Sequence, residues 1–175
     1  MFRTVPSRHL LLLTLLLAAF VAPLQGNAQP LKPVQVRELA QSLPASRILF
    51  SETMFSAEGK ELGSEMGTLD LQYPCFSVTR GALKIYGDGT SIWNYDTAAG
   101  EVMIFGGDVD ALFGGSQLSS DSARETFTLT LKDGSSIVYR ILQVETMETP
   151  WPETVFRLDV ATLGDDVIVT DLRGK

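Results

Sequence analysis

Few side chains in this sequence are suited to acid–base or nucleophilic chemistry. The 175 residues include one histidine, His9, and one cysteine, Cys75. His9 lies in an N-terminal segment that we expect to be removed. Ser-His-Asp and Cys-His catalysis and histidine metal sites are therefore excluded from the remaining chain. A single cysteine cannot form an internal disulfide, and between Pro74 and Phe76 we expect the Cys75 thiol to be buried and inert.

Carboxylates are the other candidates for chemistry. Glu52 and Glu65 could face each other across a hairpin, but nothing in the sequence places them in a cleft. Asp108, Asp110 and Asp121 could offer oxygen ligands to calcium, yet their spacing matches no known calcium loop, which favours a solvated acidic loop. We therefore predict no enzyme, no catalytic residue, no metal and no cofactor.

The N-terminus has the pattern of a secretory signal peptide. Arg3 and Arg8 precede an apolar run, Leu10–Val21, and the small residues of Gly26–Ala28 follow it. The run is shorter than the roughly 20 apolar residues that span a bilayer. We expect cleavage after Ala28, which leaves residues 29–175 as a single domain in the periplasm.

The charge of the chain limits its partners. The full sequence carries a net charge of −7, and removal of residues 1–28, which contain two arginines and no acidic residue, makes it −9. An acidic surface repels phosphate backbones, so nucleic acid is not an expected partner. We expect a monomer.

Alternation of apolar and polar residues dominates the chain after residue 44 and predicts short strands joined by glycine-containing turns. Strands joined by so few residues must pair antiparallel. The predicted strands are Ser46–Ser56, Leu62–Tyr73, Phe76–Arg80, Ala82–Tyr86, Thr90–Tyr95, Glu101–Phe105, Thr126–Leu131, Ser136–Glu145, Val155–Val160 and Val167–Leu172.

Two helices are predicted beside the strands. Val34–Leu43 has helical spacing of apolar residues and ends at Pro44, and residues 108–122 contain a short helix around Leu112 and Phe113. The predicted fold class is α+β. We expect a curled antiparallel sheet, an incomplete β-barrel, with both helices covering its concave face.

The densest aromatic pattern lies in two neighbouring predicted strands. Trp93 and Tyr95 share one face of the first strand, and Met103 and Phe105 share one face of the second. Ordinary core packing explains such alternation without any ligand. The alternative is that these side chains line a cavity.

The stretch Phe50–Phe105 resembles the periplasmic lipoprotein carriers, the LolA-like proteins, and especially their outer-membrane lipoprotein chaperone branch. The residues that carry this resemblance are Phe55, Gly59-Lys60, Gly67-Thr68-Leu69, Pro74, Phe76, Asp88-Gly89, Trp93-Asn94-Tyr95-Asp96 and Glu101-Val102. Near the end of the chain, Phe156–Asp159 and Val169–Arg173 are similar to the last two strands of the family.

The resemblance implies an incomplete barrel with a helical lid and a hydrophobic cavity that binds acyl chains. The candidate cavity residues are Phe50, Leu69, Phe76, Trp93, Tyr95, Met103, Phe105, Leu112, Phe113, Phe127 and Leu129. Two features depart from the family. Tyr73 stands where the lipoprotein carriers proper have an arginine that bonds to the lid, and the segment between Phe105 and Thr126 is short.

A carrier of acylated lipoproteins or related lipids is the function that the resemblance implies. Its partners would be an inner-membrane lipoprotein-releasing transporter and an outer-membrane acceptor. The alternative is a sensor or interaction module without enzymatic activity that uses the same cavity.

The predicted cleavage site can be tested directly. We expect the exported protein to begin near Gln29, because the small residues before it suit a signal peptidase. N-terminal sequencing of protein recovered from the periplasm measures this, and an intact Met1 on that material would contradict the signal-peptide interpretation.

Overall fold

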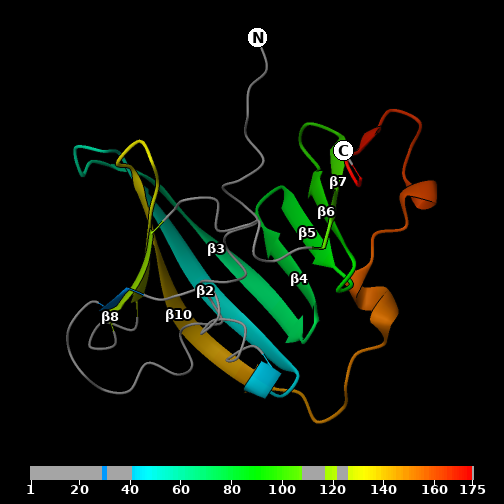
Figure 1. Cartoon of the computed structure of the whole chain (residues 1–175), viewed down its shortest axis with the longest axis horizontal. Coiled ribbons are helices and arrows are strands. Elements are labelled where there is room, and N and C mark those ends of the chain that lie inside the picture. The colour runs from blue at the N-terminus through cyan, green and yellow to red at the C-terminus, as the bar shows by residue number, and fades with distance from the viewer. Residues whose placement is uncertain (1–28, 31–40, 108–116, 122–125, 175) are drawn as a thin grey trace.

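The computed structural model describes residues 29–30, 41–107, 117–121 and 126–174. In these ranges the chain forms one sheet, two short 3₁₀ helices and a helical piece at Gln41 and Ser42 (Figure 1). The strands are β1 (Gln29–Pro30), β2 (Ser46–Phe55), β3 (Glu61–Gln72), β4 (Cys75–Arg80), β5 (Leu83–Gly87), β6 (Ser91–Asp96), β7 (Glu101–Gly106), β8 (Gln117–Asp121), β9 (Thr126–Thr130), β10 (Ser136–Thr146) and β11 (Ile168–Asp171). The 3₁₀ helices are η2 (Glu153–Phe156) and η3 (Val160–Thr162).

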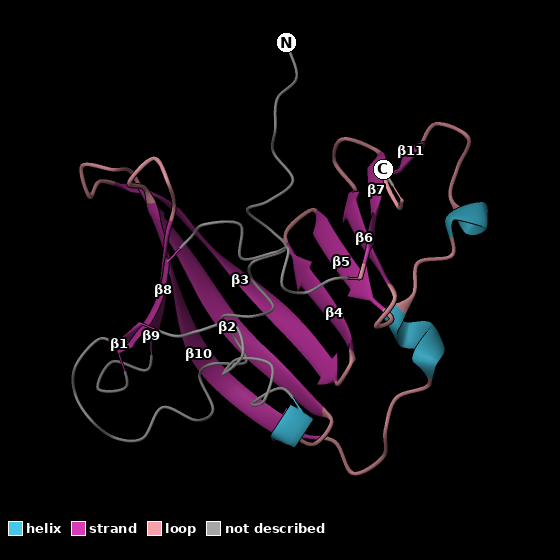
Figure 2. Cartoon of the chain, in the orientation of Figure 1, coloured by secondary structure: helices cyan, strands magenta, loops and turns pink. Residues whose placement is uncertain are grey.

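All eleven strands belong to one sheet, in the order β1-β8-β9-β10-β2-β3-β4-β5-β6-β7-β11. Neighbouring strands are antiparallel except for β11, which pairs with β7 in parallel. The sheet has two ends, β1 and β11, and is not closed into a barrel. Figure 2 shows that it is bent, with β8, β9 and β10 on one side and β5, β6 and β7 on the other.

The predicted α+β class is wrong, because the described part of the chain is nearly all strand and holds no helix of seven residues or more. The predicted helix Val34–Leu43 lies largely outside the described residues, as do residues 108–116 of the predicted inserted helix. Strand β8 occupies the end of that second region. The prediction assumed that helices must cover the sheet. In the described structure the inner cluster packs between the two limbs of the bent sheet, and the C-terminal segment packs on the other face of β5, β6 and β7.

Two predictions about the C-terminal region are also wrong. Val155–Val160 is not a strand but includes the end of η2 and the start of η3, with the Asp159 side chain accepting a hydrogen bond from the Ala161 amide. The prediction that all strands pair antiparallel is wrong for β11, which runs parallel to β7. The long segment between β10 and β11 makes this possible, because a parallel return needs a crossover of a dozen or more residues.

The predicted bounds of eight strands are confirmed within one residue at each end. These strands are β2, β3, β4, β5, β6, β7, β9 and β10. Strand β11 also lies at the predicted position. Alternation is a strong signal here because most of these strands bury one face more than the other.

Hydrophobic side chains form a separate cluster on each face of the sheet. The inner cluster lies on the side where the two limbs of the bent sheet face each other. Its buried members are Ile48, Phe50, Leu69, Leu71, Phe76, Val78, Ile85, Ile92, Phe127, Leu129, Ile137 and Tyr139. The outer cluster joins the opposite face of β6 and β7 to the C-terminal segment. Its members are Trp93, Val102, Ile104, Tyr86, Tyr95, Leu158, Val160, Leu163 and Val167.

Two phenylalanine rings of the inner cluster lie directly over glycines of the neighbouring strand. Phe50 of β2 is opposite Gly67 of β3, and Phe76 of β4 is opposite Gly87 of β5. A Cβ atom at either glycine would overlap the facing ring. These positions therefore require glycine for space.

Substitution of Gly67 tests this packing. We expect Gly67→Ala to lower the free energy of unfolding by about 1–3 kcal/mol, because the added methyl must displace the buried Phe50 ring. Urea denaturation measures the change. Gly106→Ala is the matched control, since a Cβ there meets no atom within 4 Å. Equal stability of Gly67→Ala and wild type would show that the ring does not need this space.

Candidate functional site

The structure divides the predicted cavity residues between the two faces of the sheet. The residues that contribute to the inner cluster are Phe50, Leu69, Phe76, Phe105, Phe127 and Leu129. Met103 shares this side, because it lies two residues from Phe105 on β7. Trp93 and Tyr95 lie in the outer cluster, and Leu112 and Phe113 are outside the described residues. The predicted set therefore does not line one cavity.

The inner face is mainly apolar along seven strands from β9 to β6, with Ser46, Glu52 and Asn94 as buried polar side chains on the same face. Phe50, Leu69 and Tyr139 are fully buried, and the Phe50 and Tyr139 rings meet edge to face with centroids 6.2 Å apart. Hydrophobic side chains that are only partly buried surround this core. They are Leu43, Met54, Leu83, Phe105, Leu131 and Ile141.

An ionic group bounds the inner face at one end. Glu52 and Glu65 are directly opposite each other on β2 and β3, as the hairpin prediction anticipated. Arg80 of β4 forms an ion pair with Glu52, and its Nε lies 3.5 Å from a Glu65 carboxylate oxygen. The Glu52 and Arg80 side chains are only 3% and 10% exposed. Because isolated charges are costly to bury, this close pairing accounts for their place beside the apolar cluster.

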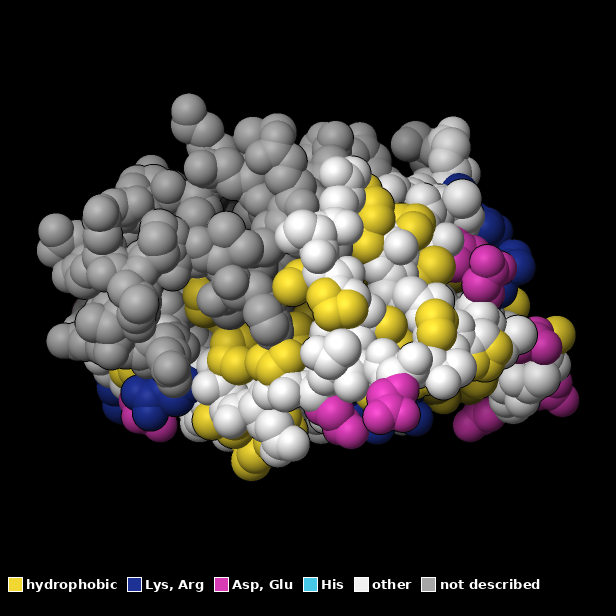
Figure 3. Space-filling view, turned by 90° about the horizontal axis from the view of Figure 1, so that it is seen from below, with side chains coloured by type: hydrophobic (Ala, Val, Ile, Leu, Met, Phe, Trp, Pro, Cys, Tyr) yellow, Lys and Arg dark blue, Asp and Glu magenta, His cyan; other side chains and the backbone are white. Residues whose placement is uncertain are grey.

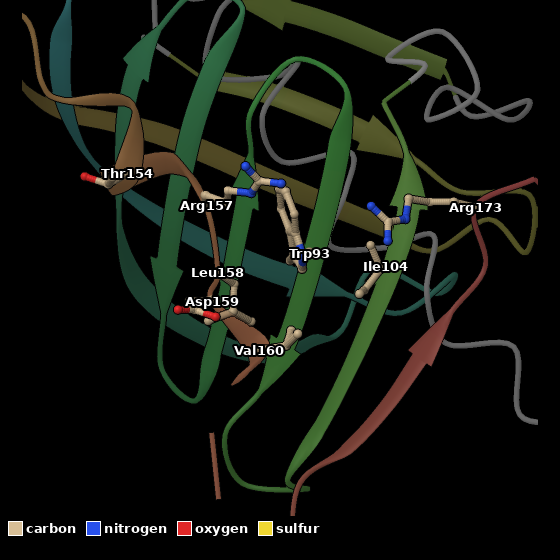
Figure 4. A pocket seen from close by; sticks show the side chains of 8 residues that line it. All are labelled: Trp93, Ile104, Thr154, Arg157, Leu158, Asp159, Val160 and Arg173. Carbon is tan, nitrogen blue, oxygen red and sulfur yellow. The ribbon is translucent and has the colours of Figure 1, made fainter. Parts of the chain in front are cut away.

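A second feature, which we call the outer pocket, lies on the opposite face of β6 and β7. It has a volume of about 470 Å³, a size typical of small-molecule sites. Trp93 and Ile104, which are paired across β6 and β7, form its floor. Figure 4 shows all the lining residues, which are Trp93, Ile104, Thr154, Arg157, Leu158, Asp159, Val160 and Arg173.

The C-terminal segment that forms the pocket wall is anchored at several points. Gln72 of β3 exchanges two hydrogen bonds with the Trp151 backbone, at 2.8 and 3.2 Å. Phe156 is fully buried and meets the Trp151 ring edge to face. The Leu172 amide donates to the Ile104 carbonyl at 2.8 Å, which places the chain end beside β7. The wall is therefore held by the sheet on both sides of the pocket.

Two arginines from different parts of this segment line the pocket: in Figure 4 the Arg157 guanidinium lies beside the Trp93 ring and the Arg173 guanidinium lies beside Ile104. The Arg157 guanidinium lies 5.7 Å from the ring centroid, within the range of a cation–π contact. Arg173 donates to Asp171 through Nε and Nη2 and to the Ser91 hydroxyl through Nη1 at 3.2 Å. The hydrogen bond to Asp171 raises the pKa of Arg173 above its ordinary value, so this group stays charged.

Asp88 lies beside the pocket and holds the turn into β6. Its Oδ1 accepts hydrogen bonds from the Thr90 amide, the Thr90 hydroxyl and the Ser91 amide at 2.9, 2.7 and 2.8 Å. Burial alone would raise the pKa of Asp88, but these hydrogen bonds and the charge of Arg157 outweigh it and lower the pKa below its ordinary value. The carboxylate is therefore ionised at neutral pH.

The remaining polar candidates show no catalytic arrangement. Burial, followed by the charges of Glu153 and Asp88, raises the pKa of the Cys75 thiol, which disfavours a reactive thiolate. Tyr73, at the place of the family arginine, accepts a hydrogen bond from the Gln41 amide at 3.2 Å. Within the described residues no three His, Cys, Asp or Glu side chains gather as metal ligands, and no helix is long and apolar enough to cross a membrane.

Several large hydrophobic side chains are exposed outside both clusters. Tyr73 and Val144 are 40% and 37% exposed. Figure 3, a view from below, shows hydrophobic side chains spread over the middle of the described surface, with charged side chains toward its edge. Scattered exposed hydrophobic residues are common on folded proteins, so we assign this surface no ligand.

Comparison with known proteins adds no relative. No protein-family model matches the chain, and no curated protein sequence matches it. The resemblance to LolA-like carriers thus stays a prediction that rests on the sequence motifs.

Sequence reasoning missed the outer pocket and both of its arginines. Arg157 and Arg173 entered only as parts of C-terminal strand motifs. Arg173 follows the alternating stretch of β11, but Arg157 follows η2, where the sequence has no alternation that marks it. Which aromatic side chain they meet depends on the parallel return of β11, which short-range patterns do not predict.

Replacement of Asp88 tests the turn that supports the pocket. We expect Asp88→Asn to lower the free energy of unfolding by about 1 kcal/mol at neutral pH, because hydrogen bonds to a charged carboxylate are stronger than those to an amide. Since the folded-state pKa is lowered, the difference is complete above the ordinary aspartate pKa of about 3.9 and is lost as the pH falls through the lowered value.

Urea denaturation of both proteins across this pH range measures the effect. Asp165→Asn, in the exposed turn before β11, is the matched control and should leave the free energy of unfolding nearly unchanged. Curves for wild type and Asp88→Asn that stay parallel down to acidic pH would contradict the role of the charge.

Proposed function

We propose that this protein is a periplasmic carrier that holds the acyl chains of lipoproteins or related lipids against the inner face of its sheet. The observation that supports this most directly is the continuous apolar surface on the inner side of an open, bent sheet. The signal-peptide pattern of residues 1–28 supports an extracytoplasmic location. The family motifs from Phe50 to Phe105 support the same function.

The inner face suits an acyl chain because most of its side chains are apolar; its buried polar side chains are Ser46, Asn94 and the ionic group that includes Glu52. An acyl chain gains about 0.8 kcal/mol for each methylene that it buries. The fully buried residues of the inner cluster provide a fixed base, and the partly buried side chains around it are free to contact a ligand. Met54 has a flexible side chain and Phe105 has a flat ring. Both can therefore pack against the irregular shape of an acyl chain.

The ionic group of Glu52, Glu65 and Arg80 limits this surface at one end. Arg80 is already paired with two carboxylates, so it does not offer a free cation to a lipid head group. A methylene chain that reached this group would lose contact with apolar side chains. We therefore propose that the acyl chain lies along the apolar part of the inner face and ends before the ionic group.

A carrier needs a donor and an acceptor as well as a binding surface. The proposed partners are an inner-membrane lipoprotein-releasing transporter and an outer-membrane acceptor, with no chemical step performed by this chain. An open sheet suits transfer, because a ligand held at its surface can leave without unfolding of a closed barrel.

Binding of a fluorescent fatty acid tests this proposal. We expect Phe105→Ala to weaken binding about tenfold or more, because it removes a large apolar contact from the inner face. Tyr86→Ala is the matched control: this aromatic side chain on β5 is also partly buried, but it packs in the outer cluster. Its binding should stay within twofold of wild type.

The melting temperature of each variant separates loss of binding from loss of folding. A wild-type protein that binds no acyl probe would contradict the carrier function, and so would equal losses for both variants. Native mass spectrometry of protein purified from the periplasm supplies an independent measurement, since a carrier should co-purify with an acylated species.

A further inference from the structure

The geometry of the outer pocket points to a second binding site, for a small organic anion whose phosphate or carboxylate group is joined to an apolar or aromatic part. We infer that Arg157 and Arg173 bind the oxyanion and that Leu158 and Val160, in the wall above the floor of Trp93 and Ile104, contact the apolar part. This site is on the opposite face of β6 and β7 from the proposed acyl site. It does not depend on the carrier function.

The outer pocket contains two positively charged side chains, although the chain as a whole is acidic. The protein has 14 basic and 21 acidic residues, yet two arginines from separate segments line the same pocket. Guanidinium groups are planar and bind phosphate and carboxylate with two parallel hydrogen bonds. Figure 4 shows the Arg157 guanidinium beside the Trp93 ring and the Arg173 guanidinium beside Ile104.

The acidic side chains near the pocket do not neutralise both arginines. Asp159 accepts a hydrogen bond from the Ala161 amide at 3.1 Å, and in Figure 4 its carboxylate points away from Trp93. Asp88 is engaged by its own turn, and its other oxygen lies 3.9 Å from Arg157 Nε, beyond hydrogen-bond distance. Only Asp171 forms a close pair, and that pair is with Arg173.

Arg157 is therefore the group best placed to take an anion. Its side chain is 66% exposed, and among the described residues its contacts are the Trp93 ring and a loose ion pair with the Asp88 carboxylate at 3.9 Å. The N–H donors of its guanidinium are accordingly available to a ligand. Arg173 adds a second positive charge that the chain end fixes in place through Ser91 and Asp171.

The apolar lining decides which anions fit. Trp93 and Ile104 are only 3% and 4% exposed, so the floor is already packed and has little surface left to cover. Leu158 and Val160 in the wall are only partly buried and supply the accessible apolar surface of the pocket. Inorganic phosphate would leave this wall in contact with water, whereas an aromatic or alkyl phosphate would cover it. An apolar molecule without charge would form no ion pair with the two guanidinium groups.

Isothermal titration calorimetry of the mature protein tests the site with three probes: phenyl phosphate, inorganic phosphate and phenol. We expect phenyl phosphate to bind at least tenfold more tightly than either of the others, and more weakly as the salt concentration rises. Absence of phenyl phosphate binding, or equal affinity for inorganic phosphate, would overturn the inference.

Arg157→Gln then identifies the residue that binds the oxyanion. This variant should lose at least tenfold in affinity for phenyl phosphate. Because the Arg157 side chain is exposed, its substitution should not unfold the protein. Arg140→Gln, on the exposed side of β10, is the matched control and should bind within twofold of wild type. Equal affinity of Arg157→Gln and wild type would overturn the assignment.

The same anion could be a free metabolite or the head group of a lipid. Sedimentation with phosphatidylcholine vesicles, with and without phosphatidic acid, separates these sources. Binding that requires both phosphatidic acid and Arg157 supports the site with a lipid head group as its ligand, and binding of phenyl phosphate alone supports it with a soluble ligand. Neither result depends on the acyl probe, so failure of the carrier proposal and failure of this inference can be told apart.

Discussion

The packing of two phenylalanine rings onto glycines of the neighbouring strand is the constraint on which the inner face depends. Phe50 lies over Gly67 and Phe76 lies over Gly87, in strands that pair side by side from β2 to β5. Glycine lets each ring lie against the backbone and removes the side chain that would resist bending of the sheet. A shift of one residue would move every ring to the other face. These contacts therefore fix the register as well as the packing.

Strands β6 and β7 are the second constraint, because they bury apolar side chains on both faces. Ile92 and Phe105 belong to the inner cluster, whereas Trp93 and Ile104 belong to the outer one. A strand that is apolar on both sides needs a second layer. The C-terminal segment supplies it and returns along β7 as the parallel strand β11. The outer pocket is the space left where this layer does not fill the surface over Trp93.

Local pattern was sufficient to predict most strands and insufficient to predict how they are arranged. Alternation and glycine turns placed β2 to β7, β9 and β10 within a residue, because these signals depend on neighbours in sequence. The parallel pairing of β11 and the division of the aromatic residues between two faces depend on contacts between distant segments. Trp93 and Met103 are an example. Each alternates correctly on its own strand, but the pairing of Trp93 with Ile104 places Met103 on the other side.

Net charge describes the chain as a whole and not the surface that a ligand meets. Because acidic residues are in excess, nucleic acid was not an expected partner. The net charge does not reveal that two arginines line one pocket. Asp171 pairs with Arg173, whereas Asp88 is engaged by its turn and Asp159 by η3, so Arg157 has no close carboxylate partner among the described residues. Because alternate side chains of β6 and β7 point to opposite faces, the same two strands support a mainly apolar surface on one side and a mixed surface with two arginines on the other. Two ligands of different chemistry could therefore be held back to back without competing for a side chain.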